Sequence, residues 1–338
     1  MLLLAGGGAV ATVGSVFNGT IWSAPATISG AMTSDELSLA VVPATGEGVG
    51  LVHTATNELE FTIYNGTTWS SFAQLHTDTT QGAPSVVGNG ATAHAVYWGT
   101  DFMFYYESFS GSAWATASPA ILPLSTSPSL CGPVAPALAA YASAASFVFV
   151  NGSCSGTVNA LYGSDLVSGV WQATANIAAG PSYAPGQHPA VTAPSSGPQL
   201  VAAYVAEGMQ QIYTAYRTAT GWSTAVLLTN GLTNDPVALA PVTGGGAVMA
   251  YRGTDNNLYT SFFSGTTWSV PVAAFSSAVT LTALPSVARG IGSATAEMAY
   301  VDGAGALWHT RYIAGAWTAA KQVGTASGFA HVAIGSGP

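Results

Sequence analysis

Two short stretches of this chain are near copies of each other: Phe263-Ser264-Gly265-Thr266-Thr267-Trp268-Ser269 and, much earlier, Tyr64-Asn65-Gly66-Thr67-Thr68-Trp69-Ser70. In both, a Ser-Gly or Asn-Gly pair separates two runs of alternating apolar residues. Glycine adopts the positive φ that a tight turn between antiparallel strands requires. Each stretch therefore predicts a β-hairpin, with the tryptophan at the start of the returning strand.

The same signal, a glycine closely followed by tryptophan, recurs through the whole chain. Successive tryptophans of the set lie 45 to 57 residues apart in a chain of 338 residues. Such a period is typical of repeat architectures. The seven copies are Gly19 to Trp22, Gly66 to Trp69, Gly111 to Trp114, Gly169 to Trp171, Gly221 to Trp222, Gly265 to Trp268 and Gly315 to Trp317.

Each repeat divides into four short strands. An inner strand follows a proline or similar breaker, as in Pro285-Ser286-Val287-Ala288, and a second ends in an apolar or aromatic pair before a polar turn. A third leads into the glycine turn, and the fourth begins at the tryptophan. No amphipathic helix interrupts the pattern. Seven units of four strands predict an all-β, seven-bladed β-propeller. The recurrent tryptophans are expected to fill the space between adjacent blades.

The two ends of the chain complete one blade between them. His331 to Gly335 reads as an inner strand with no second strand after it, whereas Leu2 to Gly6 reads as a second strand with no inner strand before it. We expect these segments to pair and close the ring. Residues 1–338 then form a single domain, with one blade shared between residues 1–30 and 331–338.

The composition excludes some classes of binding partner. The chain is 49% hydrophobic and 6% charged, with five Lys and Arg against fourteen Asp and Glu, for a net charge of −9. So few cations cannot form the basic surface that nucleic acid or an anionic membrane requires. The apolar stretch from Val134 to Val150 is explained by two buried strands, so no membrane insertion is expected. The first residues lack the basic segment of a secretory signal.

The repeat resembles a known family. Asp255-Asn256-Asn257-Leu258-Tyr259, followed by the stretch from Phe263 to Pro271, is similar to the repeat of seven-bladed bacterial lectins of the Photorhabdus PLL type, and more loosely to that of six-bladed fungal fucose lectins. The blades around Trp69, Trp114, Trp268 and Trp317 match best. The resemblance implies sugar binding, of fucose or O-methylated sugars, at several equivalent sites between neighbouring blades.

The fungal lectins hold the sugar with a repeated Arg and Glu clamp beside an aromatic ring. The four arginines of this chain share no register, so that clamp cannot recur in most blades. Either neutral donors replace it, or most sites are degenerate. The arginines are Arg217, Arg252, Arg289 and Arg311.

Candidate ligand residues lie in the loop before each inner strand and in the turn between the second and third strands, which share one face of a propeller. Polar groups beside an aromatic face suit a sugar. Local turn chemistry also favours Asp and Asn at such positions, so a purely structural role stays open. The candidates are Trp98, Asp101, Arg252, Asp255, Asn256, His188 and Trp308, of which Trp98 and Trp308 fall outside the tryptophan register.

The cysteines and histidines say less about the function. Cys131 and Cys154 fall in two such loops of one enlarged blade, where a disulfide would indicate an oxidising compartment; two buried thiols are the alternative. The six histidines show no metal-ligand spacing, so no metal or other cofactor is expected.

Enzyme chemistry is disfavoured as well. The sialidase box Ser-x-Asp-x-Gly-x-x-Trp is missing, and so is a G-x-S-x-G nucleophile turn. A glycosidase needs two carboxylates across one cleft. The pair Glu58 and Glu60 instead shares one face of a strand.

We therefore expect an extracellular or cell-surface carbohydrate-binding protein without catalysis. The alternative is a structural or self-assembling surface or fibre protein, because so few charges do little to keep copies apart. Degeneracy favours this alternative: Trp98 aligns with Arg252 in one blade but with Val150, Val205 and Val301 in others.

Overall fold

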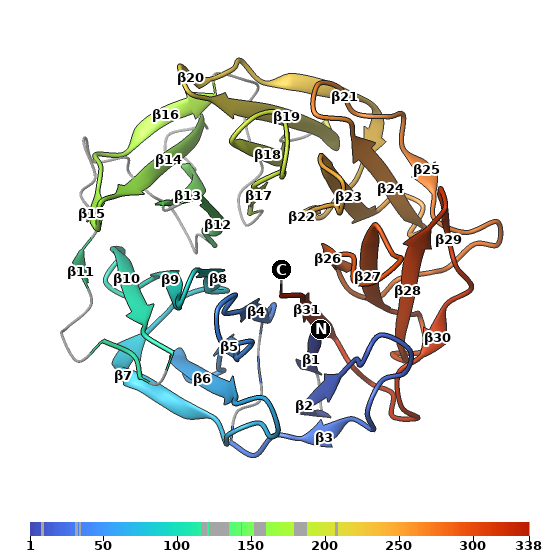
Figure 1. The fold of residues 1–338 in the computed structure, drawn as a ribbon, viewed down its shortest axis with the longest axis horizontal. Helices are drawn as coiled ribbons and strands as arrows, with labels where there is room; N and C mark the ends of the chain where they lie inside the picture. The colour runs from blue at the N-terminus through green and yellow to red at the C-terminus, as the bar shows by residue number, and fades with distance from the viewer. Residues whose placement is uncertain are drawn as a thin grey trace.

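The computed structural model describes residues 1–7, 10–30, 33, 35–111, 113–115, 120–121, 135–142, 144–151, 160–178, 188–206 and 209–337. In this part of the chain every regular element is a β-strand, and the strands form seven antiparallel sheets arranged as blades around a ring (Figure 1). The all-β, seven-bladed propeller predicted from the repeats is confirmed.

We number the blades in chain order and give the strands of each from the axis outward. Blade 1 contains β31 (His331–Gly335), β1 (Leu2–Gly7), β2 (Val10–Val16) and β3 (Ala26–Thr27). Blade 2 contains β4 (Ser38–Val41), β5 (Gly48–His53), β6 (Glu58–Tyr64) and β7 (Ala73–Thr79). Blade 3 contains β8 (Ser85–Asn89), β9 (Thr92–Trp98), β10 (Phe104–Phe109) and β11 (Ala120–Ile121).

Three of the remaining blades split the fourth strand in two. Blade 4 contains β12 (Ala137–Tyr141), β13 (Ala144–Asn151), β14 (Ala160–Val167), β15 (Val170–Trp171) and β16 (Ala175–Ala178). Blade 5 contains β17 (Ala190–Thr192), β18 (Leu200–Val205), β19 (Gln211–Thr218), β20 (Gly221–Trp222) and β21 (Val226–Leu232). Blade 6 contains β22 (Ala238–Pro241), β23 (Ala247–Arg252), β24 (Leu258–Phe263) and β25 (Val272–Ala273). Blade 7 contains β26 (Ser286–Arg289), β27 (Ala296–Val301), β28 (Leu307–Ile313), β29 (Ala316–Trp317) and β30 (Lys321–Gln322).

Blade 1 closes the ring as the terminal segments predicted. β31 pairs antiparallel with β1, from Leu2 opposite Gly335 to Gly6 opposite His331. Figure 1 shows the two strands side by side near the axis. Val332, Ala333 and Ile334 are all buried, so the pairing places apolar side chains of the last strand in the core.

The Gly-Trp stretches form the predicted hairpins. Gly66 and Gly265 adopt φ of 97° and 100°, and the Asn65 side chain accepts hydrogen bonds from the amides of Thr67 and Thr68, both at 3.0 Å. Each tryptophan pairs with a residue near the end of the third strand. In order around the ring, these partners of the tryptophans are Phe17, Tyr64, Phe109, Leu166, Arg217, Phe263 and Tyr312.

The hairpin tryptophans pack on the blade that precedes their own, which confirms their interpretation as spacers between sheets. Trp114 meets Phe61 edge-on with ring centroids 5.9 Å apart, and Trp171 meets Tyr106 at 5.3 Å. The Trp69 ring lies so close to Gly14 that a Cβ built on that glycine would lie 2.3 Å from Nε1.

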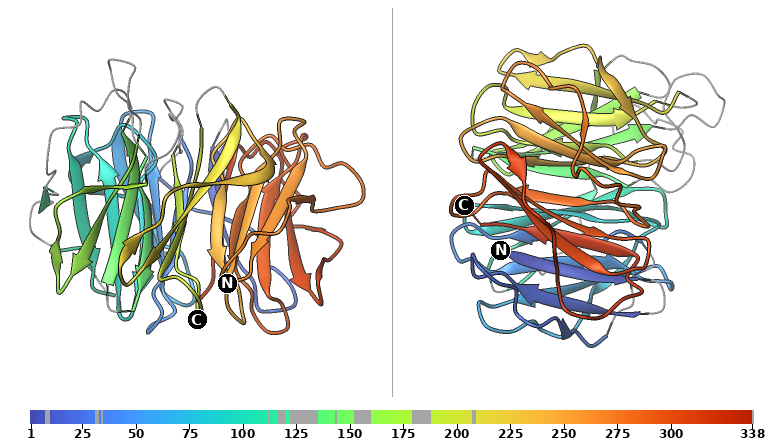
Figure 2. Two further views of the ribbon diagram at one scale, coloured as in Figure 1. Left: turned by 90° about the horizontal axis from the view of Figure 1, so that it is seen from above. Right: turned by 90° about the vertical axis from the view of Figure 1, so that its right-hand side faces the viewer.

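The propeller has two different faces, which Figure 2 shows edge-on. We call the end with the turns between second and third strands the turn face. The opposite end, which carries the Gly-Trp hairpins, is the hairpin face. On the axis, the inner strands of all seven blades surround a cavity of about 350 Å³. No helix in the described residues is long and apolar enough to span a membrane.

Candidate functional site

A cavity of about 840 Å³ lies between blade 7 and blade 1, on the side of the hairpin face. We call it the seam pocket, because these blades meet where the ring closes. Blade 1 contributes its hairpin and blade 7 its outer strands. The lining residues are Phe17, Gly19, Thr20, Ile21, Trp22, Ser23, Ala24, His309, Thr310, Arg311, Ile313, Thr318, Ala319, Lys321, Gln322 and Gly324.

Beneath the pocket lies a buried charged cluster. Glu297 on β27 is opposite Arg311 on β28, and both side chains therefore point to the same side of the sheet. The Arg311 Nε donates to both carboxylate oxygens of Glu297, at 3.1 and 3.2 Å. His309, two residues before Arg311 and on the same side, places its Nε2 3.0 Å from the Glu297 Oε2. Glu297 is fully buried, so these contacts offset the desolvation of its charge.

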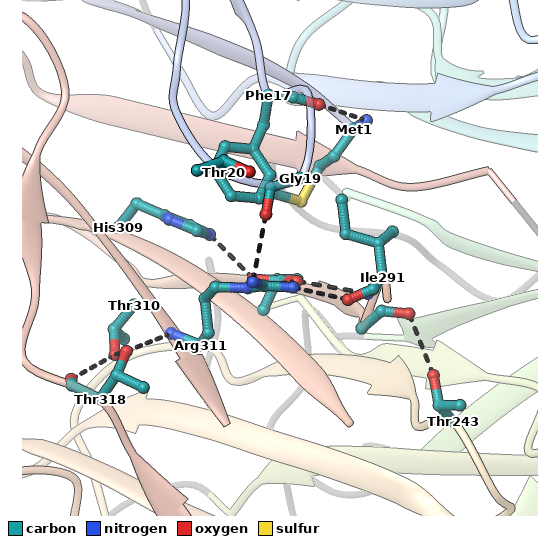
Figure 3. Close-up of polar contacts among 12 residues, drawn as sticks. Met1, Phe17, Gly19, Thr20, Thr243, Ile291, His309, Thr310, Arg311 and Thr318 are labelled. Atoms are coloured by element: carbon teal, nitrogen blue, oxygen red, sulfur yellow. Dashed lines mark hydrogen bonds and ion pairs between the residues drawn. The ribbon is translucent and has the colours of Figure 1, made fainter. Parts of the chain in front are cut away.

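Backbone groups from two blades fix the guanidinium of Arg311. Its Nη1 donates to the carbonyl of Gly19 at 3.3 Å, and its Nη2 donates to the carbonyl of Ile291 at 2.6 Å. Figure 3 shows Arg311 between these two carbonyls. The Arg311 Cζ also lies 5.4 Å from the centre of the Phe17 ring. The arginine is thus held at the boundary between the blades, with 19% of its side chain exposed to the pocket.

The wall contributed by blade 1 is aromatic and apolar. Trp22 meets His309 edge-on at 5.1 Å and lies 5.1 Å from Phe17. Ile21, beside it, is 63% exposed. This wall thus offers apolar surface opposite the polar groups of blade 7. Pockets for small ligands commonly combine apolar walls with a few placed polar groups, and they commonly measure about 300–1,000 Å³.

The strand pairing aligns the seven blades, and among the aligned positions the charged cluster occurs in blade 7 only. Arg311 precedes the residue that pairs with Trp317. The residues at the matching position in blades 1 to 6 are Val16, Ile63, Ser108, Asp165, Tyr216 and Phe262. Among the described residues, the one close Arg–Glu pair is Arg311 with Glu297. Sequence reasoning singled out neither residue of this pair.

The residues predicted from the sequence lie in four different blades. In blade 3, Asp101 is exposed and accepts a hydrogen bond from the hydroxyl of Tyr105. In blade 7, Trp308 is half-buried, and its Nε1 donates to Asp302 at 2.7 Å. These carboxylates and rings bond within their own turns, which is the structural role that turn chemistry favours.

The prediction for Trp98 needs correction. Its side chain is fully buried, packed against Phe104 at 4.6 Å in a core cluster shared by blades 3 and 4. No face of its ring is free for a sugar. The residue lies outside the hairpin register because it ends β9, where its side chain points into the neighbouring blade instead of to the surface.

Arg252, Asp255 and Asn256 are in blade 6, but they do not form one constellation. Arg252 makes a two-pronged ion pair with Asp235, at 2.7 and 2.8 Å, and these hydrogen bonds raise its pKa. Asp255 accepts hydrogen bonds from Asn257 and Tyr259, which lower the pKa of its carboxyl. Asn256 is exposed at a φ of 63°. The turn is thus stabilised internally.

His188 lies at the axis, on the turn face. Its Nε2 bonds with Glu36 of a distant blade, and both line a cavity of about 190 Å³. Burial alone would lower the pKa of His188, but the Glu36 carboxylate outweighs it and raises the pKa. Cys131 and Cys154 lie outside the described residues, so their pairing stays a prediction. In the described part no three His, Cys, Asp or Glu side chains are grouped to hold a metal ion.

A second buried charged region lies between blades 2 and 3. Glu107 is 2% exposed, and its Oε1 has no hydrogen-bond partner among the described residues. Burial, with the nearby charge of Asp78 as a second cause, raises the pKa of Glu107 to about 7. His76, at a φ of 53° in a bulge of β7, places its Nε2 3.8 Å from Glu107.

The fold and the pocket define the class of protein: a seven-bladed propeller with a charged pocket between two of its blades. No protein-family model and no curated protein match the sequence. Solved structures do match. The BP39L lectin from Burkholderia pseudomallei is 14% identical, with a TM-score of 0.77, over 95% of this chain and 94% of that chain.

Two fungal proteins are similar too. The fucose-specific lectin from Aleuria aurantia is 15% identical, with a TM-score of 0.57, over 87% of this chain and 96% of its own. AofleA from Arthrobotrys oligospora is 10% identical, with a TM-score of 0.58, over 90% of both chains. The Aleuria lectin has six blades. The chain therefore has the propeller fold of these lectins, as the repeat resemblance predicted.

Proposed function

We propose that the protein binds carbohydrate in the seam pocket and catalyses no reaction. The observation that carries the proposal is the composition of the pocket: an aromatic and apolar wall around Trp22 faces the fixed cluster of Arg311, Glu297 and His309. Sugars bind to such pairs of surfaces, because their rings have an apolar face and polar edges. The fold shared with proteins described as lectins supports the same ligand class.

The number of sugar sites that we propose rests on the alignment of the blades by their strand pairing. The pairing of Glu297 with Arg311 is confined to blade 7 among the aligned blades, so we propose one principal site. Fucose and O-methylated sugars remain ligands to test first, as the repeat resemblance implies. An extracellular or cell-surface location is part of the proposal, because glycans of that kind are displayed there.

A glycan array, with fucosylated and O-methylated sugars included, tests the proposal. The variant Ala319→Trp fills the pocket from an exposed lining position, and Ala73→Trp places the same ring at an exposed position of β7. We expect saccharide binding by the wild type and Ala73→Trp, and its loss in Ala319→Trp. No binding by the folded wild type would refute carbohydrate binding, and retained binding by Ala319→Trp would refute the site.

One observation favours the second candidate, a self-assembling structural protein. Exposed apolar residues lie on or beside the outer strands of adjacent blades 5 and 6: Val226 at 51%, Leu227 at 43%, Val270 at 55% and Val272 at 59%. Such surface favours association between copies. Light scattering coupled to size-exclusion chromatography distinguishes the two functions: assemblies that form without saccharide and are lost in Val272→Ser favour the structural one.

A further inference from the structure

The charge of the seam pocket differs from that of the protein. The chain carries five Lys and Arg against fourteen Asp and Glu. Two of the five cations, Arg311 and Lys321, nevertheless line this one pocket, and no Asp or Glu is among its lining residues. Lys321 is the single lysine of the sequence. The pocket is a positive site on a negative molecule.

The strand pairing shows how the lysine is aimed. Lys321 on β30 pairs with His309 on β28, so the two side chains project from the same side of the sheet. Arg311, two residues after His309, shares that side. It is the side that faces the hairpin of blade 1, since Trp22 meets His309 there. Three basic side chains therefore point from blade 7 toward the pocket.

The two cations differ in how far their charge is already balanced. The guanidinium of Arg311 is paired with Glu297 and held by two carbonyls. Lys321 is exposed, and among the described residues it makes no ion pair. Its ammonium is thus the uncompensated charge at the pocket. A mobile lysine at the rim can reach an anionic substituent while the Arg311 cluster stays in place.

We propose that the saccharide bound in the seam pocket is anionic, carrying a carboxylate or a sulfate ester that pairs with Lys321. The inference rests on the proposed function, whose site it specifies further. The ring of the sugar lies against the wall around Trp22 and Ile21, and the acidic group points to Lys321. The net charge of −9 repels an anion from the molecule as a whole, whereas the ammonium of Lys321 attracts it at this pocket.

Isothermal titration with matched sugars tests this: a hexuronic acid, the corresponding neutral hexose, and the 6-sulfated hexose. We expect an acidic sugar to bind about tenfold more tightly than the neutral one, the effect of one charge-assisted contact. Lys321→Gln removes this preference by lowering the affinity for the acidic sugars, and Lys321→Arg restores it. Whether the carboxylate or the sulfate binds more tightly identifies the acidic group.

The control Arg289→Gln changes the net charge equally, but at the axial cavity, and keeps the preference. The preference also weakens between 0.1 and 1 M salt, because ions screen an exposed pair. Equal binding of neutral and acidic sugars, or an unchanged preference in Lys321→Gln, would overturn the inference while carbohydrate binding stands. If no saccharide binds the folded protein, both proposals fail.

Discussion

Replacing Glu297 by Gln tests the buried cluster at its centre. The carboxylate accepts hydrogen bonds from the Arg311 Nε, from His309 at 3.0 Å and from the amide of Ile291 at 3.2 Å. Glutamine keeps the shape of the side chain but removes the charge. It also presents an N–H group to one of these three partners in place of an oxygen.

The expected loss of stability follows from the number of hydrogen-bond partners of Glu297. A hydrogen bond to a charged group contributes about 1.5–3 kcal/mol and a neutral one about 0.5–1.5 kcal/mol, so each of the three contacts loses about 1 kcal/mol. The sum, about 3 kcal/mol, falls at the lower end of the cost of breaking a buried ion pair. We therefore expect Glu297→Gln to lower the free energy of unfolding by about 3 kcal/mol.

Urea unfolding followed by tryptophan fluorescence measures this loss. Glu58→Gln is the matched control, since Glu58 is a half-exposed carboxylate that accepts a bond from Thr56 at 2.7 Å, and its loss should cost less than about 0.5 kcal/mol. An equally small loss in Glu297→Gln would refute the reasoning. The cluster would then contribute no net stability.

Three further changes test the ring, the spacing of the blades and the buried carboxyl. Ile334→Ala removes a buried side chain of the closing strand and should cost about 2–5 kcal/mol in urea unfolding; a loss under about 1 kcal/mol would contradict closure through β31. Gly14→Ala forces a Cβ to within 2.3 Å of Trp69 and should cost about 1–3 kcal/mol, whereas the nearest atom to a Cβ on Gly303 is 3.6 Å away, so Gly303→Ala should melt nearly as the wild type does. Because burial raises the pKa of Glu107 from 4.5 to about 7, the folded protein keeps a proton that the unfolded chain releases. Stability should then fall as the pH rises from about 4.5 to 7, by on the order of 3 kcal/mol from this group, and Glu107→Gln should make the fall between pH 5 and pH 8 smaller than in the wild type.

The ring could be predicted from sequence because its determinants are local and repeated. The glycine of each hairpin and the tryptophan after it lie a few residues apart, and the packing of one blade on the next repeats the same contact. The closing pair, β31 with β1, could be inferred because each segment lacked a partner in its own stretch of sequence.

The seam pocket could not be found in the same way. Glu297 and Arg311 are brought together by strand pairing, and the wall around Trp22 comes from the other end of the sequence. One signal was present: Arg311 occupies a position where the matching residue of blade 6 is Phe262. A charge at a position that packs against the next blade indicates a special contact. The prediction of Trp98 as a ligand residue was wrong because an aromatic residue outside the repeated Gly-Trp positions can be buried as readily as exposed.

The seam pocket has one wall from residues 17–24 and the other from residues 309–324, so no continuous segment of the chain contains it. The walls contact each other directly, as in the hydrogen bond from Arg311 to Gly19, and blade 1 itself is completed by the pairing of β31 with β1. Binding competence therefore requires that the two ends of the sequence find each other. A ligand that bridges both walls binds only when blades 1 and 7 are packed together, so its binding free energy adds to the stability of the closed ring. Recognition and structural integrity are in this way thermodynamically linked at a single place.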